Sequence, residues 1–324
     1  MGAASQQLRM KCREVLEFKV GFRSKNGYLV RVSKELRLLT IHAHPDDESS
    51  KGAGTVALYA DLGVGTTLVC CTGGEEGDIL NPAMDRPEVR SNIASIRKEE
   101  LDKAAKIIGY DTVHYLGYRD SGMEDSEANA HPDCFAMAPL DEAVERLVRI
   151  IRAERPHVIV TYPDDQQGYR HPDHLKVFDI SIPAWEAAGD PNLFPEAGDP
   201  WQPLKLYYTT WSRKRIEALH KVFLDLGLES PFNEDWFKRP SQDHRITTKI
   251  DVSQYGQIRN DALLAHATQV DPESTFWFGL PSGAAAEAYP WDDYVLAFSR
   301  VGEIAEEGDL FVGIRESEES ENNG

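Results

Sequence analysis

The hydrophobic positions from Leu36 onward follow two alternating patterns. Short apolar runs predict buried strands at residues 36–43, 66–72, 112–118 and 157–163. Each run is followed by a helical pattern, at residues 50–63, 87–109, 140–156 and 174–189, and Gly63 and Gly109 act as stop signals for the first two. Four strand-then-helix units in series predict a parallel sheet covered on both faces. We therefore expect an α/β fold with a doubly wound, Rossmann-like sheet.

The pattern changes after Gly189. The stretch 190–203 is rich in Pro, Gly and acidic residues, which indicates a boundary or a surface excursion. Beyond it we expect strands at 204–211, 245–252 and 309–314, with helices near 213–226 and 253–267. We expect residues 35–190 to form the Rossmann-like catalytic domain, and residues 191–315 to form a smaller C-terminal α/β part that completes its pocket.

The two ends of the chain differ from the middle. Residues 1–34 hold eight Lys or Arg against two acidic residues, without the apolar core of a signal peptide. We expect a basic, disordered extension whose removal leaves activity intact; a basic arm or an organellar presequence is the alternative. Residues 316–324 are acidic and low in complexity, and we expect a disordered tail.

Charge and composition narrow the function classes. A formal net charge of −19 argues against binding nucleic acid. No apolar run approaches the ~20 residues of a membrane span. The four cysteines form no CxxC pair and no framework typical of secreted proteins, which favours a cytoplasmic protein. Cys70 and Cys71 are expected to face opposite sides of a strand and to bind no metal. The sequence leaves the oligomeric state open, including a homo-oligomer.

The triplet His-Pro-Asp occurs three times, and two copies follow predicted strands. "HAHPDDE" begins at His42 and "GYRHPDH" at Gly168, and both are expected at the carboxyl edge of the sheet, where such folds bind ligands. A hydrolytic zinc site needs about three His or carboxylate ligands and an open position. His44, Asp47 and His174 could supply them. The third copy, "HPDC" at His131, lies in a polar loop and is expected to be a turn.

The neighbouring polar residues suggest further roles. Asp46 projects differently from Asp47, which leaves it free to act as a general base. His171 would flank the open coordination position, where it could stabilise an oxyanion or protonate a leaving amine. Asp173 could hold an imidazole tautomer. Glu48 is expected to be a helix-start or supporting carboxylate, and His42 to be structural or supporting.

Other kinds of site fit the same residues. His44, Asp46 and His174 also have the spacing of the facial triad in non-haem iron oxygenases, although those enzymes use an antiparallel β-helix. A non-catalytic metal-binding or sugar-binding module is disfavoured, because binding alone does not need Asp46. Iron(II) suits a His/His/Asp site as well as zinc does.

The motifs "AHPDDE" and "HPDH" together resemble the PIG-L/LmbE-like zinc de-N-acetylases. The similarity extends through "TGGEEGDILNPAMD", "IRKEEL", "LGYRDSGM" and "AHATQVDP". Within the family it is greatest to the branch of amidases that act on mycothiol S-conjugates, a reading that leans on Lys51 and "GDILNPAMD". Deacetylases acting on N-acetylglucosaminyl-inositol are the near alternative. The resemblance implies a small-molecule thiol conjugate as substrate, cleaved to glucosaminyl-inositol and an N-acetylcysteine S-conjugate as a detoxification step.

The resemblance also assigns residues. It implies zinc ligands at His44, Asp47 and His174, with Asp46 as the base and His171 as the acid or oxyanion stabiliser. Tyr169 would reach the carbonyl oxygen from a mobile loop. The expected substrate-binding residues are Lys51, Glu75, Arg97, Asp120, His266 and Gln269. For several of these a plain structural role stays open: a helix charge for Lys51 and Arg97, a turn for Glu75, and a core histidine for His266.

Overall fold

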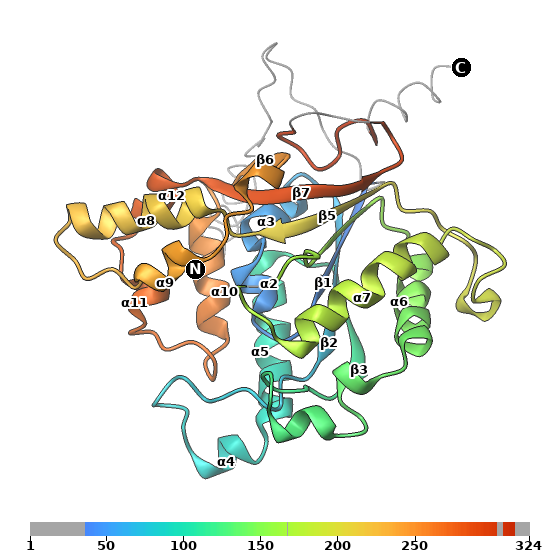
Figure 1. Cartoon of the computed structure of the whole chain (residues 1–324), viewed down its shortest axis with the longest axis horizontal. Coiled ribbons are helices and arrows are strands. Elements are labelled where there is room, and N and C mark those ends of the chain that lie inside the picture. Colours follow the sequence, from blue (N-terminus) through green and yellow to red (C-terminus); the bar gives the residue numbers. More distant parts are fainter. Residues whose placement is uncertain (1–35, 167, 303–306, 315–324) are drawn as a thin grey trace, which may run out of the picture.

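The computed structural model describes residues 36–166, 168–302 and 307–314 (Figure 1). The predictions for residues 1–34 and for the tail 316–324 lie outside these ranges. Among the residues described, no helix is both long enough and apolar enough to cross a membrane.

The centre of the molecule is one seven-stranded sheet with the order β3-β2-β1-β4-β5-β7-β6. The strands β1 to β5 are parallel, and β7 runs antiparallel to both β5 and β6. Their bounds are β1 Arg37–His42, β2 Gly65–Thr72, β3 Thr112–Tyr118, β4 Val158–Thr161, β5 Lys205–Thr210, β6 Thr248–Asp251 and β7 Trp291–Ser299. The crossover between β1 and β4 makes this a doubly wound, Rossmann-like sheet, as predicted.

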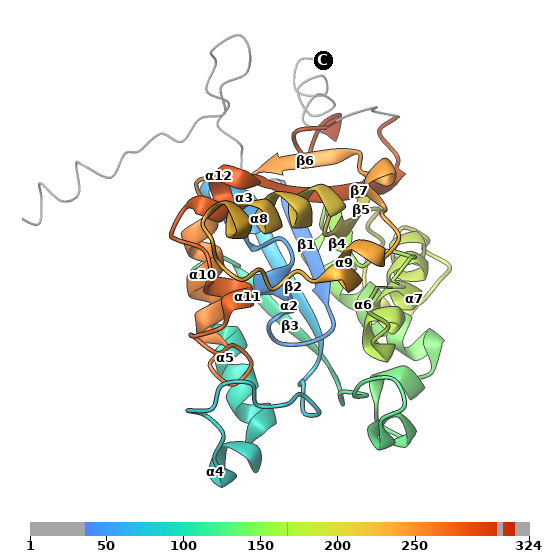
Figure 2. The ribbon, with the colours of Figure 1, turned by 60° about the vertical axis from the view of Figure 1, so that its left-hand side comes forward.

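Helices cover both faces of the sheet because the strand residues alternate in direction. Leu39 and Ile41 of β1 pack with α6 (Leu140–Glu154) and α7 (Pro172–Ala187), whereas Leu38 packs with α3 (Ala53–Asp61) and α5 (Ile93–Ile108). Helix α10 (Gly256–Ala265) lies beside α3 and α5 (Figure 2). Cys70 and Cys71 belong to different core clusters, which confirms that they face opposite sides of β2.

The residues after 190 extend the same sheet and add a group of short helices. Strands β5, β7 and β6 continue it beyond β4, so residues 190–203 link α7 to β5 without interrupting the sheet. Helix α8 (Arg213–Asp225) shares a hydrophobic cluster with α9 (Glu234–Lys238) and α11 (Thr275–Phe278), and α12 (Ala284–Ala288) packs against α8 (Figure 1). In the part of the chain that the structure describes, the remaining short helices are α2 Asp47–Ser50, α4 Pro87–Arg90 and four 3₁₀ turns at Glu127–Ala130, Phe135–Met137, Pro195–Ala197 and Asp243–Arg245.

The predicted and observed elements differ in three places. The strand predicted at 309–314 is a set of turns, since its buried residues Leu310, Phe311 and Ile314 follow a helical spacing and not an alternation. Strand β7 was not predicted, because the pair Asp292 and Asp293 hides its apolar pattern; both aspartates are buried.

The long helix predicted at 87–109 is split into α4 and α5. The side chains of Ser91 and Asn92 both donate to the carbonyl of Glu88, at 3.2 and 2.9 Å. Such local bonds compete with the helical backbone pattern and favour a break.

Candidate active site

The two motifs that follow β1 and β4 meet at the carboxyl edge of the sheet, because these strands are parallel neighbours. The turn after β1 leads into α2, and the loop after β4 leads into α7, which His171 caps by accepting a bond from the backbone N–H of Asp173. The loops that follow β2 and β3 begin at the same edge, because these strands are also parallel to β1. The predicted site residues of these four loops therefore lie at one edge of the sheet.

His44, Asp47 and His174 form a buried group whose ligand-type atoms lie within 4.8 Å of one another. One oxygen of Asp47, Oδ2, lies 3.5 Å from Nδ1 of His44 and 3.4 Å from Nε2 of His174. The same oxygen accepts from the backbone N–H of His44 at 3.0 Å. The donor set is two imidazoles and one carboxylate, which is suited to a divalent metal ion.

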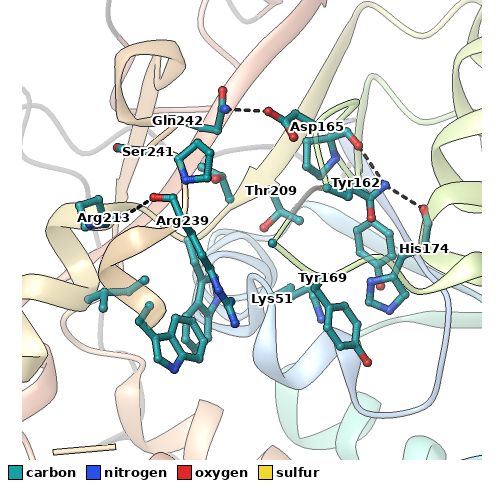
Figure 3. A pocket seen from close by; sticks show the side chains of 18 residues that line it. Lys51, Tyr162, Asp165, Tyr169, His174, Thr209, Arg213, Arg239, Ser241 and Gln242 are labelled. Atoms are coloured by element: carbon teal, nitrogen blue, oxygen red, sulfur yellow. Dashed lines mark hydrogen bonds between the residues drawn. The ribbon is translucent and has the colours of Figure 1, made fainter. Parts of the chain in front are cut away.

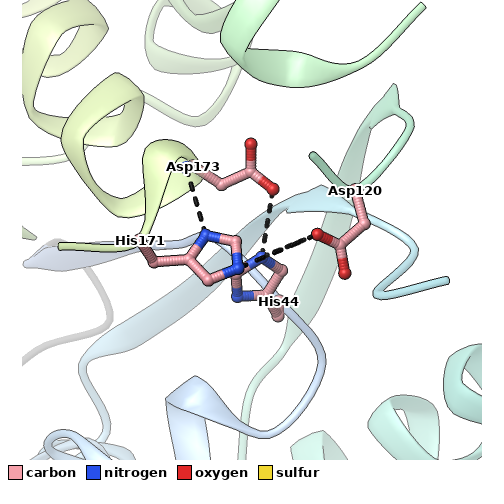
Figure 4. A group of neighbouring side chains, drawn as sticks. All are labelled: His44, Asp120, His171 and Asp173. Carbon is pink, nitrogen blue, oxygen red and sulfur yellow. Dashed lines mark hydrogen bonds and ion pairs between the residues drawn. The ribbon is translucent and has the colours of Figure 1, made fainter. Parts of the chain in front are cut away.

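The other ring nitrogen of His44 faces a second group of carboxylates (Figure 4). Its Nε2 lies 3.1 Å from Oδ2 of Asp173 and 3.5 Å from Oδ1 of Asp120. Asp173 is fully buried and also accepts from the N–H of Ser121, at 2.9 Å, and from its hydroxyl. His44, Asp120, His171 and Asp173 are a second group that could hold a metal ion.

The cluster has a strongly negative local field. Burial alone would lower the pKa of His44, yet its hydrogen bonds to Asp120, Asp173 and Asp47 raise that pKa well above its ordinary value. Burial would raise the pKa of Asp47, but Lys51 and the two imidazoles hold it well below its usual range. Burial lowers the pKa of His174 to about 4, which keeps that imidazole neutral and its nitrogen available to a metal. This field favours a cation beside His44.

Asp46 stands apart from both metal-type groups and has an unusual backbone. Its φ is 119°, a left-handed conformation that a non-glycine residue adopts at a cost of about 1–3 kcal/mol. The carboxylate of Glu48 accepts from the N–H of Asp46 at 2.9 Å through Oε2. Its other oxygen, Oε1, lies 2.7 Å from Nε2 of His266. Burial raises the pKa of Asp46, while Arg97 opposes that shift. Glu48 is thus the supporting carboxylate that the sequence predicts.

Arg97 is buried and holds the side chain of Asp46. Its Nη2 donates to Oδ2 of Asp46 at 3.0 Å and to the carbonyl of Pro45 at 2.6 Å, and its Nη1 donates to the carbonyl of Gly74 at 2.6 Å. A Cβ atom at Gly74 or Gly77 would overlap the guanidinium. The glycines of "GGEEG" therefore leave room for Arg97.

His171 and Tyr169 lie above the cluster. Nδ1 of His171 accepts from the N–H of Asp173 at 3.2 Å, and its Nε2 lies 4.0 Å from Oδ1 of Asp120. Burial and the charge of His44 both lower the pKa of His171. The ring of Tyr169 is 5.1 Å from that of His174, and the residue is 53% exposed and lines the cleft; its hydroxyl donates to Sδ of Met123 at 3.7 Å.

A cleft of about 660 Å³ opens over the cluster, and most of the predicted substrate-binding residues line it. The predicted substrate-binding residues that line the cleft are Lys51, Arg97, Asp120 and Gln269. The ammonium of Lys51 is already bound to Asp47, and it also lies over the ring of Tyr162 at 5.7 Å.

Two predicted substrate-binding residues do not line this cleft. Glu75 accepts from the N–H of Asp120 at 2.9 Å and lines a separate hollow. His266 is fully buried against Glu48, so it is the core histidine that the sequence left as an alternative. Glu76 and Asp78 line the cleft where Glu75 was expected.

One wall of the cleft was not predicted from the sequence. We call Trp211, Trp236, Phe276 and Trp277 the aromatic wall; all four are half-buried and line the cleft. Arg239 lies beside it, 4.3 Å above the ring of Trp236. The available signal was the position of Trp211 directly after β5, at the same sheet edge. Ser121, which holds Asp173, was also missed. The His-Pro-Asp copy at His131 forms an exposed turn, as predicted.

A doubly wound sheet with an imidazole–carboxylate cluster at its carboxyl edge defines the chain as an α/β enzyme with a site suited to a metal. Residues 39–185 match the family model described as PIG-L, GlcNAc-PI de-N-acetylase. The chain belongs to the PIG-L family and is an enzyme of the amidase and deacetylase class, which acts on amides.

Two relatives are matched over nearly the whole of their own length. The chain is 45% identical over 296 residues to the mycothiol S-conjugate amidase of Streptomyces coelicolor, covering 88% of this chain and 100% of the relative. It is 40% identical over 289 residues to the 1D-myo-inositol 2-acetamido-2-deoxy-alpha-D-glucopyranoside deacetylase of Thermobifida fusca, covering 85% and 98%.

Solved structures support the fold. The N,N'-diacetylchitobiose deacetylase of Pyrococcus horikoshii aligns with a TM-score of 0.54 at 17% identity, covering 91% of this chain and 93% of that one. GalB, the 4-carboxy-2-hydroxymuconate hydratase of Pseudomonas putida KT2440, gives the same TM-score and identity, covering 83% and 99%. Because a hydratase shares the fold, the fold alone does not decide the reaction.

Proposed function

We propose that the chain is a zinc-dependent amide hydrolase that cleaves mycothiol S-conjugates to glucosaminyl-inositol and an N-acetylcysteine S-conjugate. Membership of the PIG-L family and the relative that is 45% identical support this reaction class and substrate. The three described cysteines are free thiols, which accords with a reducing, cytoplasmic setting.

His44, Asp47 and His174 are the proposed zinc ligands. Ligands about 2 Å from a tetrahedral zinc lie about 3.3 Å apart, and the two distances to Oδ2 of Asp47, 3.5 and 3.4 Å, fit that spacing. With Nε2 of His44 donating to Asp173, Nδ1 is the ring nitrogen that faces Asp47, and a metal ion bound there would take the place of the second ring proton. The second group fits less well, since its carboxylates already accept from Ser121, Gly122 and the N–H of Glu76. Iron(II) would suit the same donors.

Asp46 is the proposed general base. The bound ion would act as a Lewis acid at the amide carbonyl and lower the pKa of the attacking water. Asp46 accepts the proton of that water through the carboxylate that Arg97 orients, and it returns the proton to the leaving nitrogen. A non-haem iron oxygenase is disfavoured, because the carboxylate that lies near both His44 and His174 is that of Asp47, and not that of Asp46 as the facial-triad spacing requires.

His171 and Tyr169 are the proposed partners of the developing oxyanion. Because Nδ1 of His171 accepts a backbone N–H bond, the ring proton belongs on Nε2, which lies 4.0 Å from Oδ1 of Asp120. A neutral Nε2–H donates to an oxyanion without a change of charge, so we prefer this role to that of general acid. The hydroxyl of Tyr169 is the second proposed donor, and it would exchange its weak bond to Sδ of Met123 for one to the oxyanion.

The observation that carries the choice of substrate is the order of chemistry along the cleft. The loops after β3 and β2 supply polar groups, including Asp120, Glu76 and Asp78; the loops after β1 and β4 supply the metal cluster; and the loop after β5 supplies Trp211. A mycothiol S-conjugate has a polar glucosaminyl-inositol end, a scissile amide and an S-substituent in the same order. The deacetylase substrate lacks the last part and would leave the aromatic wall unused.

The deacetylase reaction is the second candidate, favoured by the relative that is 40% identical. One experiment separates the two. The zinc-loaded protein is incubated with a mycothiol S-conjugate and, separately, with N-acetylglucosaminyl-inositol, and amine release is followed. We expect the conjugate to be the better substrate by kcat/KM. Preference for the acetyl substrate would contradict the proposal.

A further inference from the structure

The β5 end of the cleft continues into a second pocket of about 260 Å³ (Figure 3). We propose that this pocket is the subsite for the S-substituent and that Trp236 and Arg239 make it selective for flat aromatic groups. The proposal rests on the proposed function, because it assumes an S-conjugate as substrate.

The pocket and the cleft share their central residues. Lys51, Tyr169 and His174 line both, and so do Trp211, Trp236 and Arg239. A group attached close to an amide carbonyl at the metal cluster therefore enters the pocket directly. The volume is sufficient, since a closed apolar cavity of about 150 Å³ holds benzene.

The side chain of Arg239 has the chemistry of an aromatic-binding cation. Its guanidinium makes no hydrogen bond or ion pair with any described residue. It lies over the ring of Trp236, 4.3 Å from the ring centre, and the residue is exposed. Across the pocket lie His174 and the half-exposed ring of Tyr169 (Figure 3). A ring that enters between Arg239 and these two side chains gains stacking on the ring of Tyr169 on one side and a cation–π contact with Arg239 on the other. An alkyl group gains neither.

The wall behind this subsite is held in place by its own contacts. Trp211 stacks on Phe276 with ring centres 6.0 Å apart and planes 5° apart. Arg215 lies over Trp211 at 5.0 Å and Arg259 lies over Trp277 at 5.3 Å, and these side chains line a further cavity. Side chains fixed in advance lose little entropy when a ligand binds. The aromatic wall is therefore in place before the substrate binds.

The test compares S-benzyl and S-methyl conjugates of mycothiol as substrates of the zinc-loaded protein. We expect the ratio of kcat/KM, benzyl over methyl, to be roughly tenfold in the wild type. It should fall about two- to tenfold in Trp236→Ala, and about two- to fivefold in Arg239→Ala, a surface substitution that preserves the fold. Arg300→Ala is the matched control, because Arg300 stacks on Trp185 at 4.0 Å and lines neither the cleft nor the pocket; its ratio should stay at the wild-type value.

The possible results separate the two claims. Turnover of both conjugates with a ratio near one, or a ratio unchanged in Trp236→Ala and Arg239→Ala, would overturn the aromatic subsite and leave the amidase proposal standing. Hydrolysis of N-acetylglucosaminyl-inositol without hydrolysis of either conjugate would overturn the proposed function, and the subsite with it.

Discussion

Oδ2 of Asp173 lies 3.1 Å from Nε2 of His44, on the opposite edge of the imidazole from Asp47. This pairing keeps a ring proton on Nε2, so Nδ1 is the nitrogen at which a metal ion would displace the other ring proton. The choice of nitrogen at the proposed zinc site thus comes from a buried carboxylate on α7.

Replacing that carboxylate should weaken metal binding. In Asp173→Asn the amide no longer fixes the tautomer of His44, and we expect zinc affinity to fall about 10-fold to 100-fold. A competition titration with a chelator measures it. Asp179→Asn, an exposed change on the same helix, is the control. An affinity equal to that of the wild type in Asp173→Asn would show that His44 binds through another arrangement.

The glycine loop after β2 should be intolerant of a single methyl group. In Gly77→Ala the new Cβ overlaps Arg97 and contacts Gln269, so Arg97 must shift and release Asp46. We expect kcat to fall about 10-fold or more with metal content unchanged, because Asp46 loses its orientation. Gly308→Ala, where a Cβ would meet no atom within 4 Å, should have wild-type kcat. Full activity in Gly77→Ala would contradict the assigned role of Arg97.

His157 should make stability depend on pH. Burial and the nearby charge of Arg37 lower its pKa from 6.5 to about 4, and its Nδ1 accepts from the N–H of Arg37 at 3.2 Å. Between these values the unfolded chain binds a proton that the folded protein excludes. This contribution to the free energy of unfolding is therefore present above pH 6.5 and lost as the pH falls toward 4.

Urea unfolding at pH 7 and pH 4.5 measures this effect. His157→Asn keeps an acceptor for Arg37 but has no titrating ring, so its free energy of unfolding should decrease less between the two pH values than that of the wild type. An equal decrease in both proteins would contradict the assignment.

Much of the fold was predictable because β1 to β5 are buried parallel strands with clear helices between them. Local pattern could not reveal β7, whose aspartates are buried against Thr55 and Ser212, residues far away in the chain. The same limit applies to the site. The motifs identify His44, Asp46, Asp47 and His174, whereas the aromatic wall comes from segments that only the folded sheet brings together.

The separate positions of Glu75 and Glu76 illustrate a second limit. Both follow the same strand, yet only Glu76 lines the cleft, while Glu75 turns back to bind the N–H of Asp120. Which of two adjacent carboxylates faces a ligand depends on the turn between them, and this turn has Gly74 at a φ of +68°. A sequence pattern does not specify that direction.

The most direct test of the account is turnover of a mycothiol S-conjugate by Asp46→Asn, with zinc content measured on the same sample. The account predicts a full complement of zinc and a kcat lowered about 10²-fold to 10⁴-fold, because the variant keeps all three proposed ligands and loses the general base. A kcat equal to that of the wild type would contradict the role of Asp46, and loss of zinc would mean that Asp46 is itself a ligand.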